Sequence, residues 1–119
     1  MLGTNDLLQG NSAESVSERM ETFISGIRLD TSQILLIAPM PMQKGEWVPS
    51  QELIDKSEKL VIMYKNLAER LRTNFADAGE WNAPLAFDGV HLTQEGHRAF
   101  SEGLAEYLKK ENLLCFRSV

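Results

Sequence analysis

The sequence of 119 residues has one cysteine, two histidines, four prolines and no long apolar run. Cys115 therefore cannot form a disulfide within the chain, and so few sulfur and imidazole ligands give no metal-binding spacing. A membrane-spanning helix needs about 20 consecutive apolar residues, so we expect no span. No basic segment followed by an apolar stretch marks a signal peptide. These absences favour a reducing, cytoplasmic location with no metal and no cofactor.

Acidic residues outnumber basic residues by 17 to 12, which gives a formal net charge of −5. Such a surface repels phosphate backbones, so we expect no nucleic-acid partner. Hydrophobic residues make up 43% and charged residues 24%, a balance that is ordinary for a folded domain and argues against disorder. The length predicts a single domain over residues 1–119.

The chain begins with two apolar residues that run directly into the polar segment Gly3-Thr4-Asn5-Asp6. A strand normally needs about five residues, so Met1-Leu2 is expected to be only the last step of one. We therefore expect an upstream strand that has been cut away or that lies on another chain.

Helical periodicity appears in three segments of the chain. Asn11 is expected to cap an amphipathic helix over roughly 12–28. Ser50 is expected to start a long helix whose apolar face includes Phe75. Thr93 is expected to cap the last helix.

Between these helices lie two apolar segments. Residues 34–38 are apolar on both faces and end at Pro39, a pattern typical of a buried parallel strand. Residues 84–87 are expected to form a short strand. Alternating strands and helices predict an α/β fold with helices packed on a parallel sheet. Without the upstream strand, the sheet would have an open edge that invites pairing with another chain.

Polar clusters follow two of the expected strands, at the sheet edge where α/β proteins form their sites. Asn5 carries a neutral amide that could donate hydrogen bonds to a developing oxyanion. Gly3 would let the backbone turn tightly and approach a substrate. The alternative is a simple turn after a strand.

Asp88 and His91 are three residues apart, in a loop that contains Gly89. A tight turn at that spacing can bring the carboxylate onto one imidazole nitrogen, leaving the other nitrogen as a general base. The alternatives are a turn aspartate beside a partly exposed histidine, or a metal site, which the scarcity of ligands disfavours.

Other chemically capable side chains have plainer interpretations. His97 lies inside the last helix and is interpreted as a surface or packing residue. Met40, Met42 and Trp47 could line an acyl or aromatic pocket, or could belong to a loop that covers the core. Cys115 is interpreted as a buried or tail thiol.

Together, the segments 2–6 and 88–97 resemble the third and fifth conserved blocks of the SGNH (GDSL-like) hydrolase family, in the family's order. The resemblance implies a three-layer α/β/α sandwich with a flavodoxin-like parallel sheet, N-terminally truncated relative to the family. It implies an ester hydrolase in which Asn5 donates to the oxyanion, His91 is the base and Asp88 is its partner. Gly3 and Asp6 are then expected to contact a small-molecule ester substrate.

The family's nucleophile lies in a Gly-Asp-Ser block near the N-terminus, and this sequence has no such block. Every serine has a structural interpretation at a helix start, within a helix, in a turn or in the tail. A base without a nucleophile cannot perform covalent acyl transfer. We therefore expect the C-terminal part of a serine esterase, or alternatively a non-catalytic α/β module for binding or assembly. Either is expected to form a homo-oligomer or to take a second chain that completes the sheet.

Overall fold

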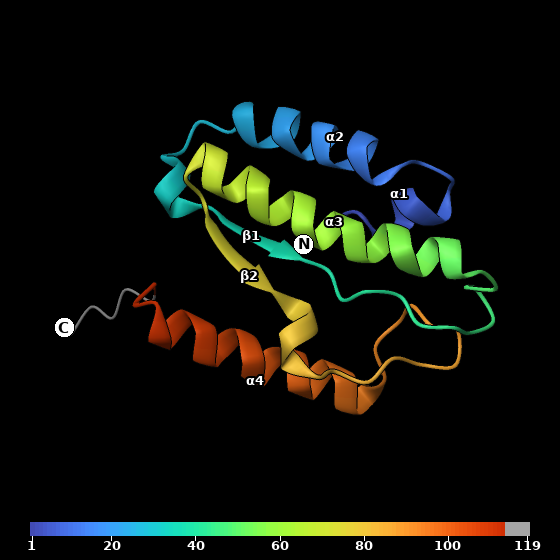
Figure 1. The fold of residues 1–119 in the computed structure, drawn as a ribbon. Coiled ribbons are helices and arrows are strands. Elements are labelled where there is room, and N and C mark those ends of the chain that lie inside the picture. Colours follow the sequence, from blue (N-terminus) through green and yellow to red (C-terminus); the bar gives the residue numbers. More distant parts are fainter. Residues whose placement is uncertain (114–119) are drawn as a thin grey trace.

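The computed structural model describes residues 1–113. Its helices and strands are α1 (Thr4–Leu8), α2 (Ala13–Ser25), β1 (Leu35–Ala38), α3 (Gln51–Leu71), β2 (Asn74–Asp77) and α4 (Gln94–Lys110). Two short 3₁₀ turns, η1 (Thr31–Gln33) and η2 (Ala78–Trp81), precede β1 and follow β2. The helices α2 and α3 lie on one side of the two strands and α4 lies on the other (Figure 1). The predicted α/β fold with three layers is therefore confirmed.

The strands β1 and β2 are parallel, with Leu35 opposite Asn74 and Ala38 opposite Asp77. A crossover through α3 connects them, as parallel pairing requires. β1 confirms the strand predicted at residues 34–38, although only Leu36 and Ala38 are fully buried. Within residues 1–113 the sheet has these two strands, so one edge of β1 has no strand partner.

The prediction that Phe75 belongs to the long helix is wrong, because this residue lies in β2. The helix ends at Leu71, and Arg72 adopts the left-handed conformation with φ of 60°. The side chain of Asn74 then donates hydrogen bonds to the carbonyl groups of Ser32 and Ile34. The apolar spacing alone predicted that the helix continues to Phe75. The contacts with the start of β1 instead place this segment in the sheet.

The strand predicted at residues 84–87 is also wrong. The segment forms only an isolated bridge, Leu85 to Leu92, which closes the loop that carries Asp88. Pro84 has no N–H group for a ladder, and its carbonyl instead accepts the backbone N–H of Thr93.

The helix predicted over 12–28 is shorter, and Ser12 rather than Asn11 caps it. The hydroxyl of Ser12 accepts the backbone N–H of Ser15 at 3.1 Å. The side chain of Asn11 is used elsewhere, since it donates to the carbonyl of Asp6 at 2.9 Å. The predicted cap of α4 is confirmed, because the hydroxyl of Thr93 accepts the N–H of Gly96.

The core lies between β1 and the layer of α1, α2 and α3. Its largest fully buried side chains are those of Tyr64, Leu7, Leu60, Leu67 and Val48. On the other face, α4 packs against η2, where Trp81 and Phe100 make a T-shaped ring contact. No helix within residues 1–113 is long and apolar enough to cross a membrane.

Candidate active site

Asn5 lies in the first turn of α1, and a glycine sets its position. Gly3 has a φ of +132°, a conformation that residues with a Cβ atom rarely adopt. A Cβ atom on Gly3 would lie 2.9 Å from Leu60 Cδ2 and 2.9 Å from the hydroxyl oxygen of Tyr64. That hydroxyl donates a hydrogen bond of 2.7 Å to the carbonyl of Leu2. The turn before Asn5 is therefore held from the buried side by α3.

The phenol of Tyr64 is fully buried, which raises its pKa to about 12. The carboxylate of Asp6 adds to this shift because negative charge opposes ionisation of the phenol. Tyr64 therefore remains a neutral donor to Leu2 throughout the physiological pH range.

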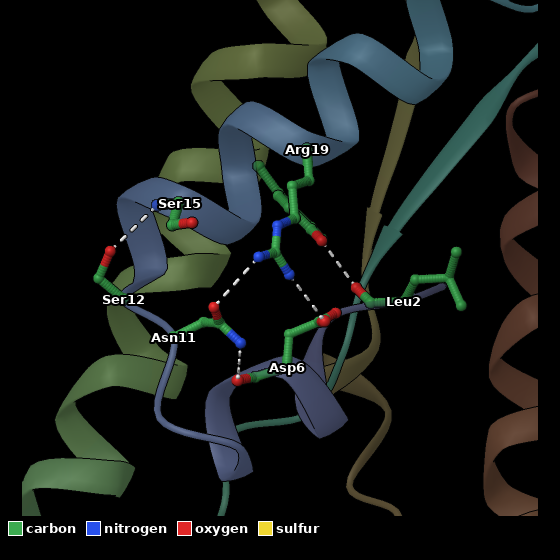
Figure 2. A network of polar contacts seen from close by, with 7 residues as sticks. Leu2, Asp6, Asn11, Ser12, Ser15 and Arg19 are labelled. Carbon is green, nitrogen blue, oxygen red and sulfur yellow. Dashed lines mark hydrogen bonds and ion pairs between the residues drawn. The ribbon is translucent and has the colours of Figure 1, made fainter.

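A second set of contacts holds the other end of the same turn (Figure 2). Arg19 of α2 reaches Asp6 Oδ1 at 3.4 Å and Asn11 Oδ1 at 3.3 Å. Both Arg19 and Asp6 are substantially exposed, so this ion pair orients the segment more than it stabilises the fold. The carboxylate of Asp6, predicted to bind substrate, is thus already engaged by a guanidinium.

The side chain of Asn5 differs from these neighbours. Asn5 is exposed, and within residues 1–113 no hydrogen bond engages its amide. Its N–H groups are therefore available to an incoming acceptor, as an oxyanion donor requires.

Asp88 and His91 form a closed turn in the loop between η2 and α4. Asp88 Oδ2 lies 2.6 Å from His91 Nδ1, while Asp88 Oδ1 accepts the backbone N–H groups of Val90 at 2.8 Å and His91 at 2.9 Å. These backbone donors, chiefly that of His91, hold the pKa of Asp88 below its ordinary value. The carboxylate side chain is 9% exposed and the imidazole 59% exposed. Asp88 thus binds Nδ1 from the buried side, and no hydrogen bond within residues 1–113 engages Nε2.

Asn5 and His91 line one hollow with a volume of about 490 Å³. Gly3 and Asp6 border it too, as do Pro39 and Met40 from the end of β1. The hollow therefore gathers a free amide and a carboxylate-supported imidazole at the carboxyl end of a parallel strand, where α/β folds place their sites.

Residues 1–99 match the sequence profile of the GDSL-like Lipase/Acylhydrolase family. The chain belongs to this family. The resemblance seen in the two polar segments is thereby confirmed, and the match covers most of the chain.

Solved structures of esterases have the same fold as this family member. A putative arylesterase from Agrobacterium tumefaciens is 28% identical with a TM-score of 0.75, over 92% of this chain and 58% of that one. A carbohydrate acetylesterase family member from Sinorhizobium meliloti is 25% identical with a TM-score of 0.78, over 96% and 60%. The M. smegmatis aryl esterase is 25% identical with a TM-score of 0.74, over 92% and 58%. The chain thus spans about three fifths of their length, and no curated protein sequence matches it.

The residues of this chain that the resemblance predicted for the site lie at one hollow in the structure. Gly3, Asn5, Asp6 and His91 border the hollow, and Asp88 supports His91 from behind. His97, interpreted as a surface or packing residue, is exposed and also borders the hollow. The sequence offered one signal for this position of His97 at the hollow, namely that the residue comes early in α4, soon after the loop of His91.

The three apolar residues of the loop after β1 have three different positions. Met42 is buried in the core, and Met40 borders the hollow, as the pocket interpretation expected. Trp47 does neither. Its ring packs against His91, a contact that no local pattern in the sequence indicates.

No serine within residues 1–113 borders this hollow. The buried hydroxyl of Ser57 donates to the carbonyl of Ile54 at 2.7 Å and accepts the N–H of Met42 at 2.9 Å. Thr4 has the only hydroxyl among the residues that border the hollow, and no hydrogen bond in the described part of the chain joins it to His91. Cys115 lies outside the described residues. Across residues 1–113, no group of three or more metal-ligating side chains forms a cluster.

Proposed function

We propose that this chain supplies the oxyanion donor and the general base of a serine ester hydrolase whose nucleophile is not in this chain. One observation supports this proposal above all others. His91, bound through Nδ1 to Asp88, borders the same hollow as the unengaged amide of Asn5. General-base catalysis needs an imidazole with one nitrogen fixed and the other free, and acyl transfer needs a donor for the oxyanion.

In this mechanism a serine hydroxyl attacks the carbonyl carbon of the ester. His91 Nε2 takes the hydroxyl proton, and Asp88 stabilises the imidazolium that forms. Asn5 donates to the carbonyl oxygen as it becomes negative. The tetrahedral intermediate then collapses, and His91 returns the proton to the leaving alkoxide. Water repeats the sequence on the acyl-enzyme and releases the carboxylic acid.

The substrates we propose are small carboxylic esters, with aryl esters and acetylated carbohydrates as the first to test. The similar solved structures, which include the M. smegmatis aryl esterase and a carbohydrate acetylesterase family member, support this choice. The mixed lining of the hollow also supports it, since Met40 and Val90 offer apolar contact beside the polar side chains of Asn5 and His97.

A second candidate is a non-catalytic module for binding or assembly. It is favoured by two observations, the unpartnered edge of β1 and the absence of a serine at the hollow among the described residues. An open strand edge pairs readily with another strand. In this case the chain would form a homo-oligomer or take up a second chain that completes the sheet.

Covalent labelling tests the first proposal. The intact gene product that contains this chain is treated with a fluorophosphonate probe, and hydrolysis of an aryl acetate is followed in parallel. We expect labelling of a serine, loss of labelling in His91→Ala, and retention of labelling in Phe87→Ala, because the side chain of Phe87 is 79% exposed and does not border the hollow. An intact protein that neither labels nor hydrolyses the ester would show that the proposed activity is wrong.

Light scattering at several concentrations tests the second candidate. An assembly module is expected to grow in mass with concentration or on addition of its partner. A chain that stays monomeric at all concentrations, and binds no second chain, would contradict it.

A further inference from the structure

The loop between β1 and α3 is fastened along the backbone of the loop that carries the Asp88–His91 pair. Three hydrogen bonds join them: Gln43 N–H to the carbonyl of Gly89 at 3.0 Å, Glu46 N–H to Phe87 at 3.1 Å, and Trp47 N–H to Asp88 at 3.1 Å. The last of these bonds ends on the residue that binds His91. The loop over residues 43–48, which we call the clamp loop, is thus part of the support for the imidazole.

The clamp loop approaches its partner so closely that a side chain would not fit at one position. A Cβ atom on Gly45 would lie 2.5 Å from the carbonyl carbon of Asp88 and 2.5 Å from the backbone nitrogen of Gly89. Contacts at this distance require the backbone itself to move. The two loops are therefore in backbone contact, and the residue two positions after Gly45 is Trp47.

The indole of Trp47 packs against the imidazole of His91. Their ring centroids are 5.0 Å apart and their planes meet at 82°, a T-shaped arrangement favoured by aromatic pairs. Trp47 is 52% exposed, so core burial does not explain where its ring lies. Trp47 is also not among the residues that border the hollow of Asn5 and His91. The indole therefore contacts the imidazole away from the hollow.

We propose that Trp47 is a positioning residue that, with Asp88, fixes the orientation of the His91 imidazole. The function of that orientation rests on the proposed role of His91 as the general base. Asp88 holds the ring through one atom, Nδ1, and a single hydrogen bond leaves the ring free to pivot. The imidazole is 59% exposed, so solvent offers it room to turn away. The indole is a second contact that prevents the imidazole from rotating into solvent, and it leaves Nε2 free for proton transfer.

Trp47 also lies within range of the charge that His91 acquires, since the two ring centroids are 5.0 Å apart. An imidazolium ring in T-shaped contact with an aromatic ring benefits from the ring quadrupole when it lies toward the aromatic face. Asp88 stabilises the same cation from the buried side. The clamp loop thus helps to support the His91 imidazole, although it lies more than 40 positions earlier in the sequence.

The proposal is tested by NMR of the histidine side chains in the 119-residue chain, with no turnover required. In the unmodified chain we expect NOEs between the rings of Trp47 and His91 and a slowly exchanging Nδ1–H signal. In Trp47→Ala we expect that signal to broaden or disappear while the backbone spectrum of the core stays unchanged. Trp47→Phe, which keeps an aromatic ring, should restore the signal.

Phe87→Ala is the matched control, because Phe87 is an aromatic residue of the adjoining loop whose side chain is 79% exposed. The variant keeps the backbone carbonyl that Glu46 binds, so the His91 signals should stay as in the unmodified chain. Three results would each overturn the proposal. The first is an equal loss of the Nδ1–H signal in Phe87→Ala and Trp47→Ala, and the second is unchanged His91 signals in Trp47→Ala. The third is the absence of an NOE between the two rings in the unmodified chain. The last test holds even if Trp47→Ala does not fold.

Kinetics of the intact hydrolase separate positioning from substrate contact. A misplaced base slows the chemical step, so Trp47→Ala should lower kcat about tenfold with little change in KM. A rise in KM with kcat unchanged would make Trp47 a substrate contact and overturn the positioning role. If the rings are ordered as expected but the intact protein never labels with fluorophosphonate, the proposed function fails while the positioning of His91 stands.

Discussion

Asp88 binds His91 twice, through Oδ1 to its backbone N–H at 2.9 Å and through Oδ2 to its Nδ1 at 2.6 Å. One carboxylate therefore sets both the turn that presents the histidine and the nitrogen that remains free. This double contact fixes the turn that presents the imidazole, so the carboxylate is expected to matter to stability as well as to the proposed catalysis.

The Asp88→Asn variant should show this contribution through its pH dependence. Donors to the carboxylate hold the pKa of Asp88 below its ordinary value of 3.8, so the folded state binds a proton less readily than the unfolded state. The stability gained is present above the ordinary pKa and is lost as the pH falls through the pKa of the folded state. Urea unfolding of both proteins between pH 7 and pH 3 measures the difference in free energy of unfolding.

We expect that difference to shrink below about pH 4, as the carboxyl group of Asp88 takes up a proton in the folded state. Asp55→Asn is a suitable control, because Asp55 lies in α3 and its exposed carboxylate accepts a hydrogen bond from Gln51 of the same helix. A difference between Asp88→Asn and the unmodified chain that stays the same down to pH 3 would contradict the assignment.

Gly3→Ala should destabilise the fold more than Gly10→Ala. Both glycines have positive φ, +132° and +96°, so each alanine carries backbone strain of about 1–3 kcal/mol. Only the alanine at Gly3 also meets side chains, those of Leu60, Tyr64 and Val16, whereas nothing lies within 4 Å of a Cβ atom at Gly10. Overpacking adds about 1–3 kcal/mol to the loss at Gly3. Urea unfolding measures the loss in free energy of unfolding for each variant. An equal loss in Gly3→Ala and Gly10→Ala would mean that the packing of α3 against this turn does not contribute to stability.

Tyr64→Phe should lower the free energy of unfolding at neutral pH by about 0.5–1.5 kcal/mol, the net value of one hydrogen bond. It should also weaken the fall of the free energy of unfolding with rising pH in alkaline solution. Burial raises the pKa of Tyr64 to about 12, so from pH 10 upward the unfolded state loses this proton first and the unmodified chain loses stability. The Phe variant lacks that titration. Unfolding at pH 7 and pH 11 measures both effects.

Tyr107→Phe is the natural comparison, since Tyr107 donates to the carbonyl of Phe75 and its pKa is also raised by burial. That variant removes a contact between α4 and β2 but leaves the turn at Gly3 intact. Backbone NMR signals of residues 3–5 should therefore move in Tyr64→Phe and not in Tyr107→Phe. The reverse pattern would disprove the role of Tyr64 in holding the oxyanion donor.

Asn5→Ala should separate stability from catalysis. The side chain of Asn5 is exposed and unengaged within the described residues, so the variant should unfold within about 0.5 kcal/mol of the unmodified chain. In the intact hydrolase, loss of one oxyanion donor should lower kcat by about 10²–10³. A marked loss of stability, or an unchanged kcat, would show that Asn5 has a structural role instead.

Local sequence signals predicted the parts of the molecule that depend on neighbours along the chain. The apolar run at residues 34–38 is β1, and the hydroxyl of Thr93 caps α4 as expected. The spacing of Asp88 and His91 likewise allowed a closed turn to be predicted, because a contact between residues three positions apart is fixed by the turn itself.

Long-range contacts decided the features that sequence reasoning missed. Phe75 continues a helical pattern, and only the contacts of Asn74 with the start of β1 move the segment into the sheet. The contact of Trp47 with His91 and that of Tyr64 with Leu2 join residues 44 and 62 positions apart. No periodicity or spacing encodes such pairs, because they arise from how the layers pack.

The two halves of the proposed site come from opposite sides of the sheet. Asn5 is carried by α1, which packs on α2 and α3, whereas His91 precedes α4 on the other face. A ligand that touches both side chains therefore ties one helical layer to the other. Its affinity is then linked to folding: at 100 times its dissociation constant, such a ligand adds about 2.7 kcal/mol to the stability of the native state. Inhibitors of this site should consequently raise the melting temperature, which makes thermal shift a direct screen for its ligands.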